Sequence, residues 1–222
     1  MSAEAAGRGL GTARVQAFSD GVFAVAITLL VLSLQPPQLS GEAAHHLARA
    51  LLDLWPRYLS YILSFVIVGI FWVSHHNTFA LYRRVDRTLL WINLLFLMCV
   101  AFVPFPTALL GVYWQERFAV AFYGGTLIVI GLVNQLMWWY ASHDGRLVGP
   151  DLHPGVRRLA VQRNLTGPVL YALAIAASLI DTRISLAVFV AVPVYYIIPS
   201  GRDQHLTATH AQRPHDGPLD SS

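Results

Sequence analysis

The sequence lacks lysine altogether, holds a single cysteine and has few charged residues of either sign. Charged side chains make up 12% of its 222 residues and hydrophobic ones 55%, whereas soluble domains carry about 25% charged residues. This scarcity of charge argues against a soluble domain and predicts an all-α integral membrane protein. Because Cys99 is alone, an intrachain disulfide and a cysteine metal cluster are both excluded. Exclusive use of arginine is typical of a GC-rich bacterial genome.

Apolar runs recur along the chain at about the length that crosses a bilayer, roughly 20 residues. They predict six transmembrane helices, at residues 14–35, 55–79, 88–111, 118–140, 159–180 and 184–198. Pro104 and Pro106 are expected to kink the third helix. We expect residues 1–12 to form a flexible cytoplasmic leader, 13–200 the six-helix domain and 201–222 a disordered cytoplasmic tail. Residues 42–54 fit either an amphipathic helix at the membrane surface or an ordinary solvated loop helix.

The distribution of arginine tests this topology. If the N-terminus is cytoplasmic, the inner segments hold eleven of the fifteen arginines. The outer segments then hold four, which are Arg49, Arg57, Arg117 and Arg183. This asymmetry follows the positive-inside rule. It predicts a multi-pass protein of the cell membrane with both termini in the cytoplasm, and it explains the basic pI of about 9.2 without a nucleic-acid partner.

The first expected helix contains an acidic residue. The uncharged run from Gly21 to Leu34 is too short to span, so a spanning helix must begin near Arg14 and include Ser19 and Asp20. The alternative is that Ser19 and Asp20 cap a helix of a soluble domain. The six-span topology favours the first interpretation. An ionisable residue inside a membrane helix is costly unless it pairs, and marks a functional or organising position.

One face of this helix carries a narrow stripe. Five residues follow one another in steps of four and three, and they are Gly21, Val25, Thr28, Leu32 and Gln35. Asp20 lies about 140° from Val25 around the helix. The helix therefore has one face suited to lining a pore and another that buries a carboxylate. Periodicity alone also fits a helix-packing seam.

Partners for Asp20 are expected at matching depth on the next two helices. These are the indole of Trp72, the imidazoles of His75 and His76, and the amide of Asn93. The two adjacent histidines also suggest a metal site. However, neighbouring helical residues point about 100° apart, and no Asp, Glu or Cys repeats at ligand spacing. A hydrogen-bond network is the favoured interpretation, and no tightly bound metal is expected.

The segment from Arg14 to Gly21 matches the pattern R-x-x-x-F-S-D-G. It resembles the signature of the transmembrane protein 175 family of potassium channels. The continuation VFAVAITLLVL, the segment FWVSHH and the run LLWINLLFLM with FVPFPTALL are similar to bacterial members. The resemblance covers about residues 12–200. It implies a homotetramer whose central pore is lined by the first helix of each six-helix subunit, and a channel without the T-V-G-Y-G carbonyl filter, a sequence absent here.

The resemblance also implies roles for individual residues. Val25 takes the place of the hydrophobic constriction, where the family commonly has a larger Ile or Leu. Thr28 takes the place of a selectivity threonine, and Leu29 and Leu32 narrow the pore further. The network that packs the first helix would contain Arg14, Ser19, Asp20, Trp72, His75 and Asn93. Arg14 is expected beneath the pore stripe if the helix is straight, and in the network if it bends.

The expected function is passive conduction of potassium, with K⁺ as the permeant ion and no cofactor. The alternative is a proton-coupled or proton-conducting secondary transporter that uses Asp20 and His75. Transporters usually carry broken helices in matched halves, and the prolines here do not form such a pair. A membrane enzyme is disfavoured because no Ser-His-Asp, H-E-x-x-H or carboxylate-pair arrangement is present. The expected partners are further copies of the chain, membrane lipid and K⁺.

Overall fold

The computed structural model describes residues 3–38, 46–149 and 154–197, with side chains from residue 11 onward. Within these ranges the chain is almost entirely helical, and its one β-bridge joins Tyr82 to Val148. The predicted all-α class is therefore confirmed. The expected tail at 201–222 lies outside the described residues.

The first helix is longer than the sequence predicts. Helix α1 runs over Ala3–Leu29 and continues into a 3₁₀ turn, η1, at Leu30–Ser33. Residues 3–12, expected to be a flexible leader, therefore belong to the helix in the part described. Three alanines favour a helix there because alanine loses no side-chain entropy on folding, whereas three glycines in the same stretch disfavour one. The helix ends before the Pro36-Pro37 pair, which cannot continue it.

The segment before the second long helix contains only a short helix. Helix α2 spans Leu47–Asp53 and buries none of its residues. Residues 39–45 lie outside the described ranges, so the expected amphipathic stretch is covered only in its second part. Helix α3 follows at Trp55–Ala80, with Pro56 in its first turn, where a missing amide hydrogen is harmless. These bounds agree with the predicted helix at 55–79.

The third predicted helix is divided in two. Helix α4 spans Arg87–Phe102 and α5 spans Pro104–Val112. Pro104 and Pro106 lack the amide hydrogens that would continue the helical ladder, so the helix breaks at Val103. The predicted kink is therefore present, as a break. At the other end, Asp86 caps α4 by accepting a hydrogen bond from the amide of Leu89 at 2.8 Å.

The remaining chain forms three helices and a short turn. Helix α6 spans Arg117–Ser142, the 3₁₀ turn η3 covers His143–Gly145, α7 spans Pro154–Ser178 and α8 spans Thr182–Ile197. Helix α7 starts five residues before the predicted 159. Helix α8 is short, as expected, with 16 residues.

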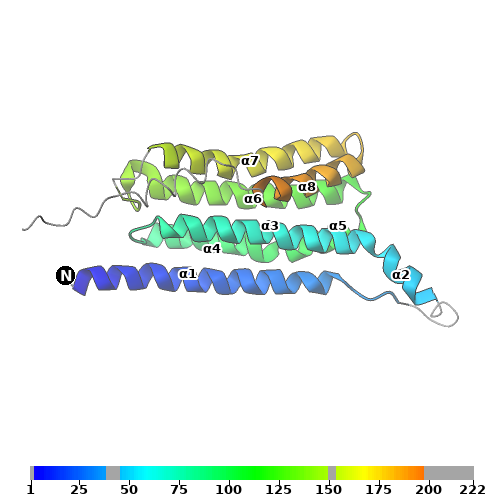
Figure 1. Ribbon diagram of the computed structural model, residues 1–222, viewed down its shortest axis with the longest axis horizontal. Coiled ribbons are helices and arrows are strands. Elements are labelled where there is room, and N and C mark those ends of the chain that lie inside the picture. The colour runs from blue at the N-terminus through cyan, green and yellow to red at the C-terminus, as the bar shows by residue number, and fades with distance from the viewer. Residues whose placement is uncertain (1–2, 39–45, 150–153, 198–222) are drawn as a thin grey trace, which may run out of the picture.

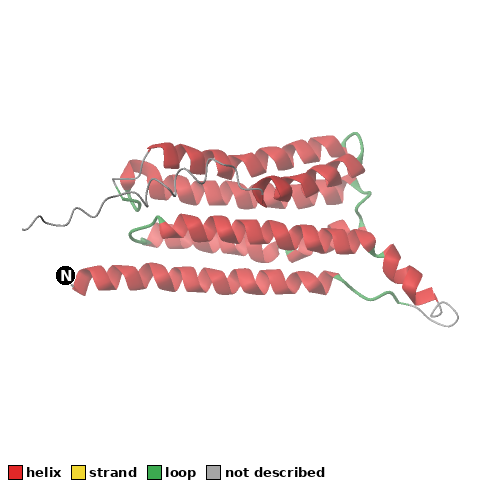
Figure 2. Ribbon diagram, viewed as in Figure 1, coloured by secondary structure: helices red, strands yellow, loops and turns green. Residues whose placement is uncertain are grey.

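The long helices lie side by side along one axis (Figure 1). Helix α1 lies at one edge and packs on α3, α4 and α5, whereas α6, α7 and α8 form the opposite edge. No strand is drawn in the described part of the chain (Figure 2). The N-terminal end of α1 lies at the same end of the bundle as the α3–α4 and α6–α7 turns (Figure 1). This is the arrangement that short connections between antiparallel helices produce.

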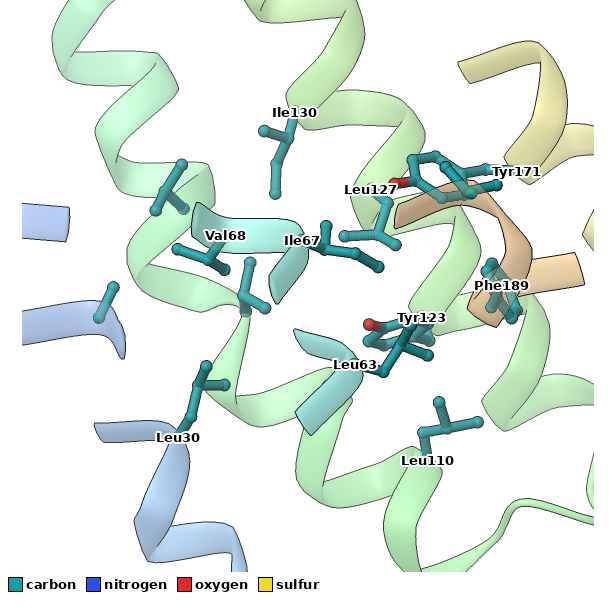
Figure 3. Packing of buried hydrophobic residues seen from close by; sticks show 14 of the residues in the cluster. Leu30, Leu63, Ile67, Val68, Leu110, Tyr123, Leu127, Ile130, Tyr171 and Phe189 are labelled. Carbon is teal, nitrogen blue, oxygen red and sulfur yellow. The ribbon is translucent and has the colours of Figure 1, made fainter. Parts of the chain in front are cut away.

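Buried apolar side chains fill the space between the helices in two clusters. The larger lies mid-bundle, where Leu63 and Ile67 of α3 meet Tyr123 and Leu127 of α6 (Figure 3). Phe189 of α8 closes it on the far side. The smaller cluster lies at the end that holds the α3–α4 turn, and it contains Phe79, Tyr82, Leu89, Met137, Trp138, Ala141, Leu147 and Val148.

In the described part of the chain, four helical segments are long and apolar enough to cross a membrane. They are Gly11–Ser33, Trp55–Ala80, Arg87–Val112 and Arg117–Gly145. Helix α8 is apolar but shorter. Helix α7 is not among the four, and it carries Arg157, Arg158 and Arg163. These spans place the protein in a membrane.

Candidate pore face and its anchoring network

Helix α1 is held in its subunit by one buried stripe. Ser19, Phe23, Ala26 and Leu30 follow in steps of four, three and four, and each is at most 1% exposed. This spacing puts them on one helix face, which packs against α3, α4 and α5. Phe23 contacts Phe96 of α4 with ring centroids 5.9 Å apart.

The other face of α1 is open and mostly apolar. Val25 is 57% exposed, Leu29 41% and Leu32 66%, and Gly21 and Thr28 are also exposed. All the residues that the sequence assigned to the pore therefore lie on the uncovered side. Large apolar faces of this kind mark surfaces that another chain or a membrane covers.

The hydroxyl of Thr28 has a defined orientation on this face. It donates a hydrogen bond to the carbonyl oxygen of Val25 at 2.9 Å. Because its hydrogen is engaged with the helix, the oxygen lone pairs remain for another group. A cation that approaches α1 would therefore meet an oxygen acceptor at Thr28 and only hydrocarbon at Val25 and Leu32.

A shallow apolar groove runs along the exposed face. It has a volume of about 440 Å³, and α1 lines it with Phe18, Gly21, Val25 and Leu29 among others. Ala101 of α4 completes one wall. Phe18, which sequence reasoning placed only in the motif, is 56% exposed on this same side. Phe18 lies seven residues, or about two helical turns, before Val25. This spacing is the sequence signal that places Phe18 on the same face of the helix.

The buried face carries a hydrogen-bonded chain across three helices. The imidazole Nε2 of His75 lies 2.8 Å from Oδ1 of Asn93, and since that oxygen only accepts, Nε2 carries the hydrogen. The amide of Asn93 donates to Oγ of Ser19 at 3.1 Å, and Ser19 donates to the carbonyl of Val15 at 2.9 Å. All three side chains are at most 2% exposed. The structure thus brings together three of the expected network residues.

Aromatic rings enclose the imidazole of His75. Its ring stacks on Phe79 with centroids 4.3 Å apart and lies almost parallel to Phe96 at 5.5 Å. Phe23 of α1 approaches from a third side, at 5.7 Å. Such a cage holds His75 in one orientation and separates it from water.

Asp20 has a separate partner. The indole Nε1–H of Trp72 donates to its Oδ1 at 2.8 Å. This contact joins α1 to α3 on the flank of the buried stripe, where Asp20 is half-buried. Asp20 and Trp72 were both predicted to belong to the network. They do contact each other, but as a separate pair beside the hydrogen-bonded series of His75, Asn93 and Ser19.

Arg14 does not join this network. Helix α1 passes without a break from Ala3 to Leu29, and Arg14 lies about 20° from Val25 around it. Within the described residues, no hydrogen bond or ion pair links Arg14 to Asp20 or to the other network members. The straight-helix alternative is therefore the one the structure contains, with Arg14 exposed below the groove.

Two further contacts escaped the sequence analysis. The amide Nε2 of Gln16 lies 2.8 Å from Nδ1 of His76, which adds a second tie between α1 and α3. At mid-bundle, Thr107 Oγ1 lies 2.7 Å from Ser64 Oγ, which lies 2.9 Å from the hydroxyl of Tyr123. This second network joins α5, α3 and α6. A lone hydroxyl in an apolar run gives no signal of its partner, so sequence could not reveal it.

The described residues contain no group of three His, Cys, Asp or Glu side chains that could hold a metal ion. His75 and His76 make separate contacts, with Asn93 and Gln16 respectively. The hydrogen-bond interpretation of the histidine pair therefore accounts for both rings.

Comparison with known proteins places this geometry in a family. A family model described as the endosomal/lysosomal potassium channel TMEM175 matches residues 14–104. A protein named potassium channel from Streptomyces collinus is 39% identical over 187 residues, which covers 82% of this chain and 90% of that protein. The human protein named endosomal/lysosomal proton channel TMEM175 is 28% identical over 179 residues, covering 79% of this chain and 35% of that protein.

A solved structure agrees with these relatives. The crystal structure described as a lysosomal potassium-selective channel TMEM175 homologue from Chamaesiphon minutus matches with a TM-score of 0.75 at 39% identity. It covers 83% of this chain and 95% of that one. The matched family segment contains α1 from Arg14 onward and all of α3 and α4, the three helices that build the exposed face and its network. This chain belongs to the TMEM175 family of ion channels.

Proposed function

We propose that this protein conducts potassium passively through a pore lined by α1. The observation that carries the proposal is the uncovered face of α1, which from Phe18 to Leu32 is hydrocarbon except for Thr28 and whose opposite face is fixed by buried contacts. Two bacterial relatives 39% identical to the chain are named potassium channels. Within this face, Val25 is the constriction, Thr28 the selectivity position, and Leu29 and Leu32 narrow the path further.

The same proposal includes a homotetramer of subunits with six membrane spans. One chain exposes the groove on α1, so the groove becomes a closed path only when copies surround it. Closed cyclic symmetry brings identical faces to one axis. The remaining two spans are α7 and α8. Helix α7 packs antiparallel on α6 and α8 packs antiparallel on α7, so both continue the bundle. With the N-terminus cytoplasmic, the arginine-rich turns lie inside.

A hydrophobic gate follows from the residue types. A ring of Val25 and Leu32 side chains offers water no hydrogen bonds, so a narrow ring excludes water and with it a hydrated ion. Opening requires the α1 helices to move apart or rotate. Once the ring is wide enough, the Thr28 oxygens replace part of the ion's water shell.

Anchoring is the proposed role of five of the six expected network residues, which form two separate groups in the fold. Ser19, Asn93 and His75 lock α1 to α3 and α4, and Asp20 with Trp72 adds a second tie. Arg14, at the cytoplasmic mouth, would instead bear on the entry of ions. There its positive charge faces the same side as Val25.

Recording from the purified protein in planar bilayers tests the proposal. We expect channel currents in a K⁺ gradient, with a reversal potential that favours K⁺ over Na⁺. A Val25→Ala variant should conduct more, because smaller side chains leave a wider opening in the ring. Val31→Ala is the matched control, since Val31 is an exposed valine about 120° away around the helix and does not line the groove. Saturable flux that requires a proton gradient would instead establish the transporter alternative. A proton gradient without K⁺ belongs in the same experiment, because the human relative is named a proton channel.

A further inference from the structure

Arg14 lies on the side of α1 that faces away from the rest of its subunit. The buried stripe of this helix consists of Ser19, Phe23, Ala26 and Leu30. At 100° per residue, the direction directly opposite this stripe falls about 30° from Arg14. The Arg14 side chain is exposed, and α1 lies at the edge of the bundle (Figure 1). Arg14 therefore faces the axis around which the proposed tetramer forms.

The depth of Arg14 places it at one mouth of the proposed pore. Helix α1 is unbroken between Arg14 and Val25, so their positions are about 16 Å apart along the helix axis. The N-terminal end of α1 lies at the same end of the bundle as the α3–α4 and α6–α7 turns (Figure 1). The proposed topology puts these turns in the cytoplasm. A K⁺ ion that leaves the cytoplasm would therefore pass Arg14 before it reaches Val25 and Thr28.

No acidic residue lies within one turn of Arg14 on its own helix. The residues three and four positions away, which are its neighbours on the helix surface, are Leu10, Gly11, Ala17 and Phe18. Among the described side chains, no hydrogen bond or ion pair engages the guanidinium of Arg14. In the isolated subunit, its charge is therefore balanced by water and dissolved ions.

The two acidic residues of α1 stand apart from Arg14. Asp20 lies about 120° around the helix and about 9 Å along it, where it is half-buried and accepts a hydrogen bond from Trp72. Glu4 lies about 15 Å from Arg14 in the other direction along the helix. By position on the helix, Arg14 is the charged residue of α1 nearest to the direction of Val25.

We propose that Arg14 forms a ring of positive charge at the cytoplasmic mouth, which makes outward K⁺ current smaller than inward current. The ring lowers the concentration of K⁺ at the mouth and so slows entry from the cytoplasm, whereas K⁺ from outside enters at the other mouth. If each guanidinium of the tetramer lies about 10 Å from the ion path, the ring lowers local K⁺ about tenfold in the absence of screening. This inference rests on the proposed function, and it names Arg14 as a residue that sets the direction of easier conduction.

Current–voltage curves from inside-out patches, in which the cytoplasmic face is known, test the ring. Symmetrical KCl of about 0.01 M and about 1 M gives Debye lengths of about 30 Å and 3 Å, so the ring acts at a distance only in the first solution. We expect the wild-type protein to pass less outward than inward current at low salt and nearly equal currents at high salt. Arg14→Gln should raise the outward current about threefold or more at low salt, and it should have little effect at high salt.

Further variants separate the charge of Arg14 from a structural role. Arg14→Lys keeps the charge and should keep the asymmetry of the current. Arg14→Glu reverses the charge and should raise the outward current beyond that of Arg14→Gln. A residue that only stabilises the fold would not produce an order that follows charge and fades with salt. Arg158→Gln is the matched control, because it removes an exposed arginine from α7, at the opposite edge of the subunit.

The outcomes distinguish this inference from the channel proposal. Equal outward currents in Arg14→Gln and the wild-type protein at low salt would overturn the inference alone, and they would indicate that an acidic group of a neighbouring copy neutralises Arg14. An increase of the inward current instead would place Arg14 at the outer mouth and also overturn it. Absence of K⁺ current from the wild-type protein and from every variant would refute the channel proposal and this inference with it.

Discussion

Thr28 is the one polar residue on the central part of the uncovered face of α1. Its hydroxyl hydrogen is bound to Val25, so the oxygen is oriented without help from an ion. We expect Thr28→Ala to weaken the preference for K⁺ over Na⁺, whereas Thr28→Ser should retain it because the oxygen remains. Reversal potentials in mixed K⁺ and Na⁺ solutions measure the change. An unchanged reversal potential in the alanine variant would remove Thr28 from the selectivity position.

Asp20 accepts a hydrogen bond from the indole of Trp72. Asp20→Ala leaves that indole without its acceptor and should cost about 1–3 kcal/mol. We therefore expect fewer assembled oligomers on size exclusion in detergent, with normal unitary conductance in those that form. Asp20→Asn keeps an acceptor oxygen and should assemble better. Intact oligomers with an altered conductance would show instead that Asp20 acts on the ion path.

The helices that lie farthest from the pore face are held together by close approach. At Gly131 of α6, an added Cβ would lie 2.6 Å from Cγ of Pro168 in α7. Helices in membranes commonly pack through small residues for this reason. Gly131 and Pro168 therefore set the separation of α6 and α7.

Replacing this glycine tests that contact. Gly131→Ala should destabilise the protein by about 1–3 kcal/mol, as overpacking does. Gly125→Ala is a control on the same helix, because nothing lies within 4 Å of its Cβ position. Thermal unfolding in detergent, followed by fluorescence-detected size exclusion, compares the two. Equal melting temperatures would show that α7 can shift to accommodate the added methyl group without loss of stability.

Element positions followed from the sequence wherever composition changed sharply. The prolines predicted the break between α4 and α5, and the charged turn at Arg83–Arg87 predicted the end of α3. The start of α1 was missed because the residues before Arg14 are small and polar, a composition that fits both a leader and a helix. The network was predicted as one set, but its division into two depends on which rotamers the side chains adopt.

At the scale of the whole molecule, topology is the most direct test. Removing the single cysteine by Cys99→Ala provides a background for labelling in sealed cells. We expect Asp144→Cys, in the α6–α7 turn, to react only when a membrane-permeant reagent is used. Glu116→Cys, in the α5–α6 turn, should react with an impermeant reagent. Reaction of both with the impermeant reagent would contradict the six-span arrangement.

The candidate pore face of α1 lies on the outside of each chain, so in the proposed tetramer every copy supplies a quarter of the same ring. This arrangement has a genetic consequence. A variant that folds and assembles but blocks the pore at Val25 would then enter channels together with normal chains. With equal expression and random mixing, about one channel in sixteen would be free of it. Such alleles would act dominantly, whereas those that break the contacts of Ser19 or Asn93 would be recessive, because their products never reach the ring.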